Sequence, residues 1–121
     1  MSHIVTLPSA VVNTPAPLGD FEQLVLLAVM RTSQDGLAYG ITVFDELVAH
    51  TKRRVARAAV YMTLDRLENK GLLSSVLTAP TAERGGRAKR CYRVTKPALV
   101  ALRDSREGLT NLWAGLNWTA R

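Results

Sequence analysis

The strongest constraint on the fold is a helix pattern followed directly by two strand patterns around a glycine pair. The helix is indicated by three apolar residues at i, i+4 and i+7, namely Val60, Leu64 and Leu67. Gly71 is placed to end this helix, and the segments 72–78 and 88–94 then predict two strands. Gly85–Gly86 lies between them and supplies the backbone freedom that a hairpin loop needs. The middle of the chain is therefore expected to end in a helix and a β-hairpin.

Two patterns upstream predict two more helices. Asp20 and Gln23 resemble a capping box at the start of the first helix, which the polar segment 32–36 ends. Apolar residues run almost continuously along this helix, which indicates that it packs on two sides. The second helix is expected over about 37–50, with one apolar face made of Ile41, Phe44, Leu47 and Val48.

Three helices followed by a hairpin is the element order of a winged helix-turn-helix. A last helix is expected from Thr95, an N-cap residue type, with Pro97 in its first turn. The predicted fold class is mainly α with a small β-hairpin, a winged helix-turn-helix domain plus a C-terminal dimerisation helix. The expected boundaries are a flexible N-terminal arm over 1–18, the winged-helix domain over 19–94, and the dimerisation helix and tail over 95–121.

The basic residues are concentrated in one part of the chain. The formal net charge is +6, and residues 52–96 hold twelve of the sixteen Lys and Arg residues but only three of the ten acidic residues. This distribution favours a polyanionic partner, nucleic acid ahead of an acidic membrane surface. The basic stretch 81–94 then serves as the wing, whose cations meet phosphates. A basic face that only aids solubility is the alternative.

Composition gives little support to other classes of function. Cys91 is the only cysteine and the chain has two histidines, so neither a disulfide framework nor a zinc site is expected. Residues 1–18 resemble neither a signal peptide nor a membrane span, which indicates a cytoplasmic protein without a membrane partner. No nucleotide-binding glycine loop precedes a Lys-Ser or Lys-Thr pair, so neither an enzyme nor a cofactor is expected.

The third helix carries the candidate contacts to DNA bases. If its apolar face is buried, its outer face consists of Arg57, Ala58, Tyr61 and Met62, together with Asp65. Arg57 can reach a phosphate or a guanine edge, Ala58 allows close approach to a groove wall, and Tyr61 combines a flat ring with a hydroxyl. Burial of Tyr61 beneath the wing is the alternative.

Further residues are candidates for contact with the DNA backbone. Arg53 and Arg54 precede the third helix, and Arg84 lies in the basic wing. Tyr39 falls near the N-terminus of the second helix, where its hydroxyl and free N–H groups could share a phosphate. Packing of Tyr39 against the first helix is the alternative.

Four segments together carry a resemblance to a known family. They are LGDFEQLVLLAVM, LAYGITVFDEL, RRVARAAVYMTLDRLENKGLL and ERGGRAKRCYRVT, in this order over residues 18 to about 116. The chain resembles the PadR family of winged-helix transcriptional regulators, in the short-tailed subgroup with a single C-terminal helix. The positions that match the family pattern directly are Tyr39, Tyr61, Arg66, Gly85, Gly86, Arg87 and Lys89.

The resemblance implies a cytoplasmic, homodimeric transcription factor, usually a repressor, with the third helix in the major groove and the wing alongside. Two positions depart from the family pattern. Ala56 stands where Ser is frequent, so the expected N-cap of the third helix is absent. Cys91 stands where an aromatic residue is common. Nearby cations lower the pKa of a thiol in general, which leaves a redox role open, and a small strand residue without a chemical role is the alternative.

The last helix predicts a dimer interface. An a/d seam of 3-4-3-4-3 spacing consists of Leu99, Leu102, Arg106, Leu109, Trp113 and Leu116. A second stripe of mostly small residues, which includes Leu112, runs beside it, and one monomer cannot easily bury both. The over-apolar first helix, with Leu24 and Leu27, poses the same problem, and one interface that joins these helices resolves both. A last helix folded entirely onto its own domain is the alternative.

Two function classes follow from these patterns. The first is a sequence-specific DNA-binding regulator, a homodimer that reads two half-sites of a palindrome. The second is a winged-helix module that binds an acidic protein. A gap beside Trp113 in the dimer would suit a planar aromatic effector, and the alternative is that Trp113 only anchors the interface.

Overall fold

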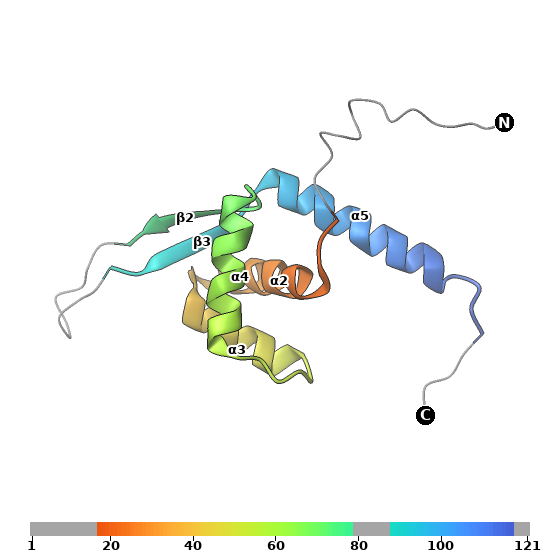
Figure 1. Cartoon of the computed structure of the whole chain (residues 1–121), viewed down its shortest axis with the longest axis horizontal. Helices are drawn as coiled ribbons and strands as arrows, with labels where there is room; N and C mark the ends of the chain where they lie inside the picture. The colour runs from red at the N-terminus through yellow and green to blue at the C-terminus, as the bar shows by residue number, and fades with distance from the viewer. Residues whose placement is uncertain (1–16, 79–87, 118–121) are drawn as a thin grey trace.

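Figure 1 shows the computed structural model, in which residues 17–78 and 88–117 are described. The helices are α2 (Asp20–Asp35), α3 (Gly40–His50), α4 (Arg57–Asn69) and α5 (Lys96–Trp113). The strands are β1 (Ala38–Tyr39), β2 (Leu73–Leu77) and β3 (Arg90–Val94). The first three of these helices form the body, while the β2–β3 hairpin leaves it on one side and α5 on the other. This arrangement confirms the predicted fold class.

The core lies between α2, α3, α4 and the hairpin. The apolar face predicted for the third helix is fully buried, with Val60, Leu64 and Leu67 inaccessible to solvent. They meet Val25, Leu26 and Val29 of α2, Val43 and Leu47 of α3, and Leu73 and Tyr92 of the sheet. The 3.6-residue period of α4 therefore fixes which of its side chains remain outside.

The sheet has one strand more than the sequence indicated. Its order is β1-β3-β2 with antiparallel neighbours, and the residues of β1 pair with Tyr92 and Cys91 of β3. The expected helix over 37–50 was therefore wrong at its start, since the chain first forms β1 and the helix begins at Gly40. The side chain of Thr42 fixes this start, because its Oγ1 accepts a hydrogen bond of 2.9 Å from the backbone N–H of Tyr39.

The first turn of α2 also differs from its prediction. The N-cap residue is Gly19, and Glu22 rather than Gln23 completes the turn by accepting a hydrogen bond of 2.9 Å from the Gly19 N–H. The helix continues through the polar segment to Asp35, and Gly36 is its C-cap. Asp20 is thus the first helical residue, where its charge suits the positive end of the helix dipole.

Glu22 is a buried carboxylate that joins α2 to the end of α4. Its Oε2 lies 2.7 Å from Lys70 Nζ and 3.5 Å from Arg66 Nε. Burial raises the pKa of Glu22, but the hydrogen bonds from Lys70 and the Gly19 N–H and the charges of Lys70 and Arg66 outweigh it, so its pKa lies below the ordinary value. The ionised form therefore stabilises the fold.

We expect Glu22→Gln to lower the free energy of unfolding at pH 7 by about 1.5–3 kcal/mol, because hydrogen bonds to charged groups contribute about this much. A lowered pKa in the folded state gives stability that is present above the unfolded-state pKa and is lost as pH falls through the folded-state pKa. The two proteins should therefore converge in acid. Denaturant unfolding at pH 7 and in acid measures the difference, with exposed Glu107→Gln as the control, and a constant difference across pH would contradict the role.

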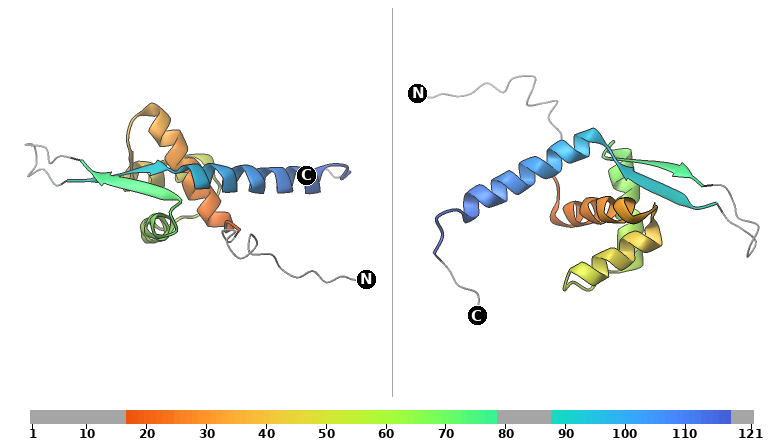
Figure 2. Two further views of the ribbon diagram at one scale, coloured as in Figure 1. Left: turned by 90° about the horizontal axis from the view of Figure 1, so that it is seen from above. Right: turned by 180° about the vertical axis from the view of Figure 1, so that it is seen from behind.

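The helix α5 extends away from the body (Figure 2). Near its start Ala98 is buried and Leu102 packs partly against the core, but every described residue from Arg106 to Asn117 is exposed. Within the part of the chain that the structure describes, no helix is long and apolar enough to cross a membrane.

Candidate nucleic-acid interface

The outer face of α4 is accessible, as the helical period predicted. Arg57 and Ala58 are exposed in its first turn, and Tyr61 and Met62 follow in the second, with Tyr61 42% exposed. The helix begins at Arg57 after Ala56, which has no side-chain cap hydrogen bond. Arg57 thus occupies the N-terminal end of the helix, where its side chain is accessible to a ligand.

Arg57 is held by an aromatic ring of the preceding helix. Its guanidinium carbon lies 5.3 Å from the centroid of the Phe44 ring. A cation at this distance over a ring face is attracted by the ring quadrupole. The contact therefore limits the conformations of Arg57 at the exposed end of α4.

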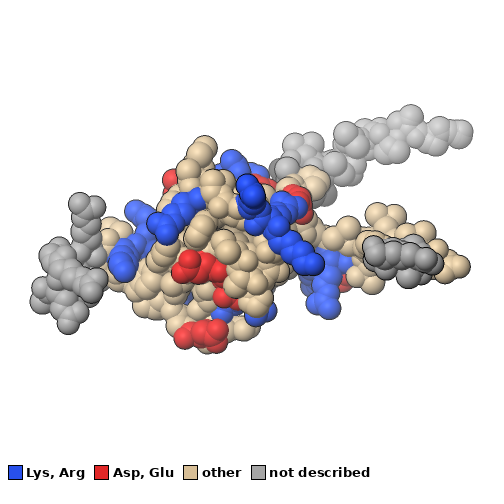
Figure 3. Space-filling view, turned by 90° about the horizontal axis from the view of Figure 1, so that it is seen from below, with Lys and Arg blue, Asp and Glu red and all other residues tan. Residues whose placement is uncertain are grey.

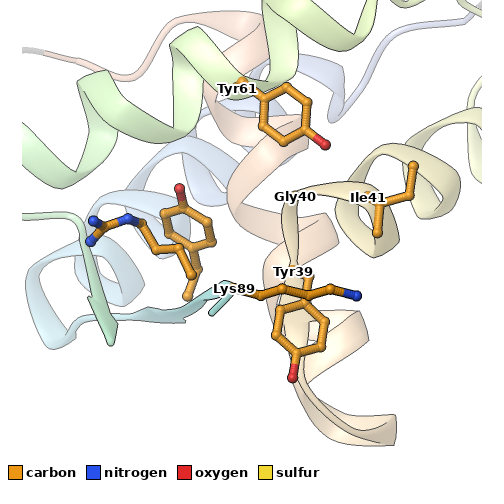
Figure 4. A pocket seen from close by; sticks show the side chains of 7 residues that line it. Tyr39, Gly40, Ile41, Tyr61 and Lys89 are labelled. Atoms are coloured by element: carbon orange, nitrogen blue, oxygen red, sulfur yellow. The ribbon is translucent and has the colours of Figure 1, made fainter. Parts of the chain in front are cut away.

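A hollow of about 340 Å³ lies between α4, the first turn of α3 and β3 (Figure 4). We call it the tyrosine pocket, and its lining residues are Tyr39, Gly40, Ile41, Tyr61, Lys89, Arg90 and Tyr92. The three segments are far apart in sequence, and the fold brings their hydroxyl groups and cations together. The pocket therefore joins the outer face of α4 to the base of the wing.

Two contacts shape the tyrosine pocket. A Cβ atom on Gly40 would overlap the ring of Tyr61, so only glycine allows this approach of α3 to α4. The Tyr61 ring therefore packs against the start of α3. On the other side, Lys89 Nζ lies 5.4 Å from the centroid of the Tyr39 ring (Figure 4). Tyr39 itself ends β1 and is the N-cap residue of α3.

Sequence reasoning missed Arg90 and Tyr92 as lining residues of this pocket. Tyr92 is only 6% exposed. Burial raises its pKa, and the carboxylate of Asp65 adds to the effect, so the phenol is neutral and remains a hydrogen-bond donor. Alternation along a strand places side chains three residues apart, such as Lys89 and Tyr92, on opposite faces, so it gives no signal that both border one hollow.

Several of the predicted site residues do not line the tyrosine pocket. Arg53 forms an ion pair with Asp20 at the start of α2. Arg66 donates a hydrogen bond of 3.2 Å to Thr63 Oγ1 and approaches Glu22. Arg54 is exposed in the turn before α4. The predicted wing residues Arg84, Gly85, Gly86 and Arg87 lie outside the described residues.

Charge is unevenly distributed over the face seen from below in Figure 3. Lys and Arg side chains gather in the upper half of this view, the side of α4, whereas the most prominent acidic side chains lie at its centre and lower edge. The basic part of the face therefore lies on the same side of the molecule as α4. Such a surface attracts a polyanion.

A second hollow of about 440 Å³ lies between α2 and α5. We call it the α2–α5 groove, and its lining residues are Gln23, Leu27, Met30, Leu99, Leu102, Arg103, Arg106, Leu109, Thr110 and Trp113. Six of the nine residues predicted at a dimer interface thus line this one groove between α2 and α5. Leu24, in contrast, packs against the core of its own chain, and Leu112 and Leu116 are exposed beyond the groove.

The three-helix body with its β2–β3 hairpin and the exposed outer face of α4 define a winged helix-turn-helix protein. Residues 26–103 match the transcriptional regulator PadR-like family. The transcriptional regulator Rv3488 of Mycobacterium tuberculosis is 35% identical over 88 residues, which cover 73% of this chain and 78% of that protein. The chain therefore belongs to the PadR-like family of transcriptional regulators. This membership confirms the resemblance and the prediction that the chain is a regulator and not an enzyme.

Solved structures share the fold at low sequence identity. A PadR family transcription regulator from Clostridium difficile superposes with a TM-score of 0.63 at 17% identity and covers 78% of this chain and 91% of its own. RosR of H. salinarum gives a TM-score of 0.61 at 22% identity, with 84% and 83% covered. A PadR-like regulator from Bacillus cereus gives 0.57 at 20% identity, with 79% and 93% covered.

Proposed function

We propose that this chain is a sequence-specific, DNA-binding transcriptional repressor that acts in the cytoplasm as a homodimer on a palindromic operator. The observation that carries the proposal is the tyrosine pocket, because it joins the exposed face of α4 to Lys89 at the base of the wing. A helix of this kind enters the major groove while an adjacent basic element follows the phosphates.

The residues take two kinds of role in this proposal. Contacts to base edges come from the first two turns of α4, through Arg57, Ala58, Tyr61 and Met62. Contacts to phosphates come from the surrounding elements, through Tyr39, Arg53, Arg54, Arg66, Arg84, Gly85, Gly86, Arg87 and Lys89. Arg53 and Arg66 would exchange their carboxylate partners for phosphate, and both side chains are about half exposed, which permits the exchange.

The dimer is proposed to form through α5 and the α2–α5 groove. The groove is bordered by apolar side chains, and Leu27, Leu99 and Leu109 are each at least 45% exposed in the single chain. Apolar surface of this extent on a single chain is typical of an interface. Its proposed members are Leu24, Leu27, Leu99, Leu102, Arg106, Leu109, Leu112, Trp113 and Leu116.

Trp113 is also the proposed site of a planar aromatic effector. It lies at the exposed end of the α2–α5 groove, beyond Leu109 and Thr110. A ligand that stacks there would change the spacing of the two recognition helices and so alter DNA affinity. The effector proposal fails if no planar aromatic compound that quenches the fluorescence of Trp113 changes the affinity for DNA.

The experiment that tests the main proposal is a selection of duplexes from a random pool at moderate salt. Strong enrichment of a palindromic sequence is expected. The competing proposal is a winged-helix module whose basic face meets an acidic protein. It predicts salt-sensitive retention of all duplexes alike without enrichment, and that outcome would remove the repressor assignment.

We expect the double variant Arg87→Ala, Lys89→Ala to weaken binding to every duplex by the same factor. For each phosphate contact that is lost, binding releases about one counterion fewer. The magnitude of the slope of log affinity against log salt should therefore fall by about 0.9 per contact. Titrations at several salt concentrations measure this slope. As a matched control, the salt slope of Lys89→Ala is compared with that of Lys96→Ala, which removes the same charge from the start of α5. An unchanged slope in the double variant would remove the wing from the interface.

A further inference from the structure

Three polar side chains connect α4 to both strands of the wing. Arg90 of β3 donates a hydrogen bond of 2.8 Å to Ser75 Oγ of β2. Ser75 Oγ in turn donates a hydrogen bond of 2.5 Å to Glu68 Oε2 near the end of α4. We call Glu68, Ser75 and Arg90 the wing-base relay. Both bonds involve a charged partner, which makes them shorter and stronger than bonds between neutral groups.

The wing-base relay lies where apolar packing of the hairpin ends. Leu73 of β2 is buried in the core, and Ser75 is half-buried two residues later. The next residue on the same face is Leu77, which is 61% exposed. Among the described residues, no side chain of β2 beyond Ser75 is buried in the core. In the described part of the hairpin, the side-chain hydrogen bond from β2 to α4 is therefore made where burial of β2 ends.

Because the relay lies at the base of the hairpin, a small change of angle there displaces the rest of the wing. Thr78 lies three positions after Ser75, and its N–H donates a hydrogen bond of 2.8 Å to the Lys89 carbonyl across the hairpin. Three strand residues span about 10 Å. A tilt of about 15° at the relay would therefore move this end of the hairpin by about 2.5 Å. A displacement of this size is enough to break a hydrogen bond between the wing and a DNA phosphate.

We propose that Glu68, Ser75 and Arg90 are positioning residues that set the angle between the wing and α4, and thereby determine whether both can contact one duplex at the same time. This proposal rests on the proposed function, since it concerns the same interface. None of the three side chains needs to touch DNA. Arg90, although it borders the tyrosine pocket, acts here through its hydrogen bond to Ser75.

Serine variants on opposite faces of β2 test the relay. Ser75→Ala removes the hydroxyl, Ser75→Thr retains it, and Ser74→Ala removes a hydroxyl from the adjacent, exposed position. Affinity is measured for the duplex that wild type selects from a random pool, at a temperature where all variants are folded. Ser75→Ala should weaken binding about five- to tenfold, in the range by which residues outside a binding site alter affinity. Ser75→Thr and Ser74→Ala should remain within about twofold of wild type.

A second background distinguishes positioning from a purely structural role. In Lys89→Ala, the wing has lost the contact that the relay would align, so Ser75→Ala should cost less than about twofold there. The same fivefold loss in both backgrounds, or equal behaviour of Ser75→Ala and Ser74→Ala, would overturn the proposal.

A measurement without DNA separates this proposal from the proposed function. Residual dipolar couplings of backbone amides report the orientation of the β2–β3 hairpin relative to α4. Ser75→Ala should change this orientation or widen its range, and Ser74→Ala should not. Unchanged couplings in Ser75→Ala would overturn the relay even if the chain selects no duplex.

Discussion

Leu109→Glu is expected to convert the proposed dimer into monomers and to lower the affinity for a palindromic duplex about a hundredfold or more, which corresponds to about 2.7 kcal/mol. Leu109 borders the α2–α5 groove and is 55% exposed in the single chain. A carboxylate placed there would lose its hydration among the apolar side chains of the groove when the subunits meet, and the burial of a charge is costly. A monomer then has only one recognition helix for two half-sites.

The same substitution should leave the folded domain intact, because Leu109 lies on the exposed part of α5 and contributes nothing to the buried core. Sedimentation gives the oligomeric state, thermal unfolding checks the fold, and a titration with the selected duplex gives the affinity. Asn111→Glu adds the same charge to α5 outside the groove, and it should remain dimeric. A dimeric Leu109→Glu protein would place the interface elsewhere.

The sequence was most informative where one period determined the structure. The i, i+4, i+7 spacing of Val60, Leu64 and Leu67 correctly predicted the buried face of α4, and hence the exposure of Arg57 and Tyr61. Such a period is a local property, since a single buried stripe on a helix leaves only one face for solvent. Gly71, with a positive φ of 79°, likewise ended α4 as expected.

The sequence was less informative where distant segments meet. β1 has two residues, too few for any alternation pattern, and it exists because Ala38 and Tyr39 pair with β3 more than fifty residues later. The tyrosine pocket has the same origin, because α3, α4 and β3 each contribute lining residues, and none of these elements forms a pocket by itself. The capping error at α2 was smaller. Glu22 follows Gly19 by three residues, and Gln23 follows Asp20 by three residues, so both pairs fit the spacing of a capping box.

The last helix lies between these cases. Its two stripes were recognised from spacing, and the structure divides them along the helix: Ala98 is buried against the body, whereas the described residues from Arg106 onward are exposed. A helix that packs on its own domain along its whole length would have a buried stripe to its end. The exposed second half of α5 therefore supports the proposed interface over the alternative.

Replacing Arg57 or Tyr61 with Ala is the second change with a large expected effect. Each variant should relax the sequence preference, with a loss of discrimination of about 1–3 kcal/mol for each base contact removed. Both side chains are positioned before DNA arrives: Arg57 lies over the Phe44 ring, and the Tyr61 ring packs against Gly40. Such preorganisation reduces the side-chain entropy lost on binding, so more of each contact energy is retained in the affinity.

The decisive measurement compares the selected duplex with a scrambled duplex of the same length, for wild type and each variant. Arg57→Lys is the matched control for Arg57, since it retains the charge but cannot bond a guanine edge in the bidentate manner of a guanidinium. It should keep the affinity for scrambled duplex while losing preference for the selected one. Tyr61→Phe separates the hydroxyl from the ring in the same way. If the Ala variants lose affinity for both duplexes equally, Arg57 and Tyr61 contact only the DNA backbone, and the bases must be read by other residues of α4.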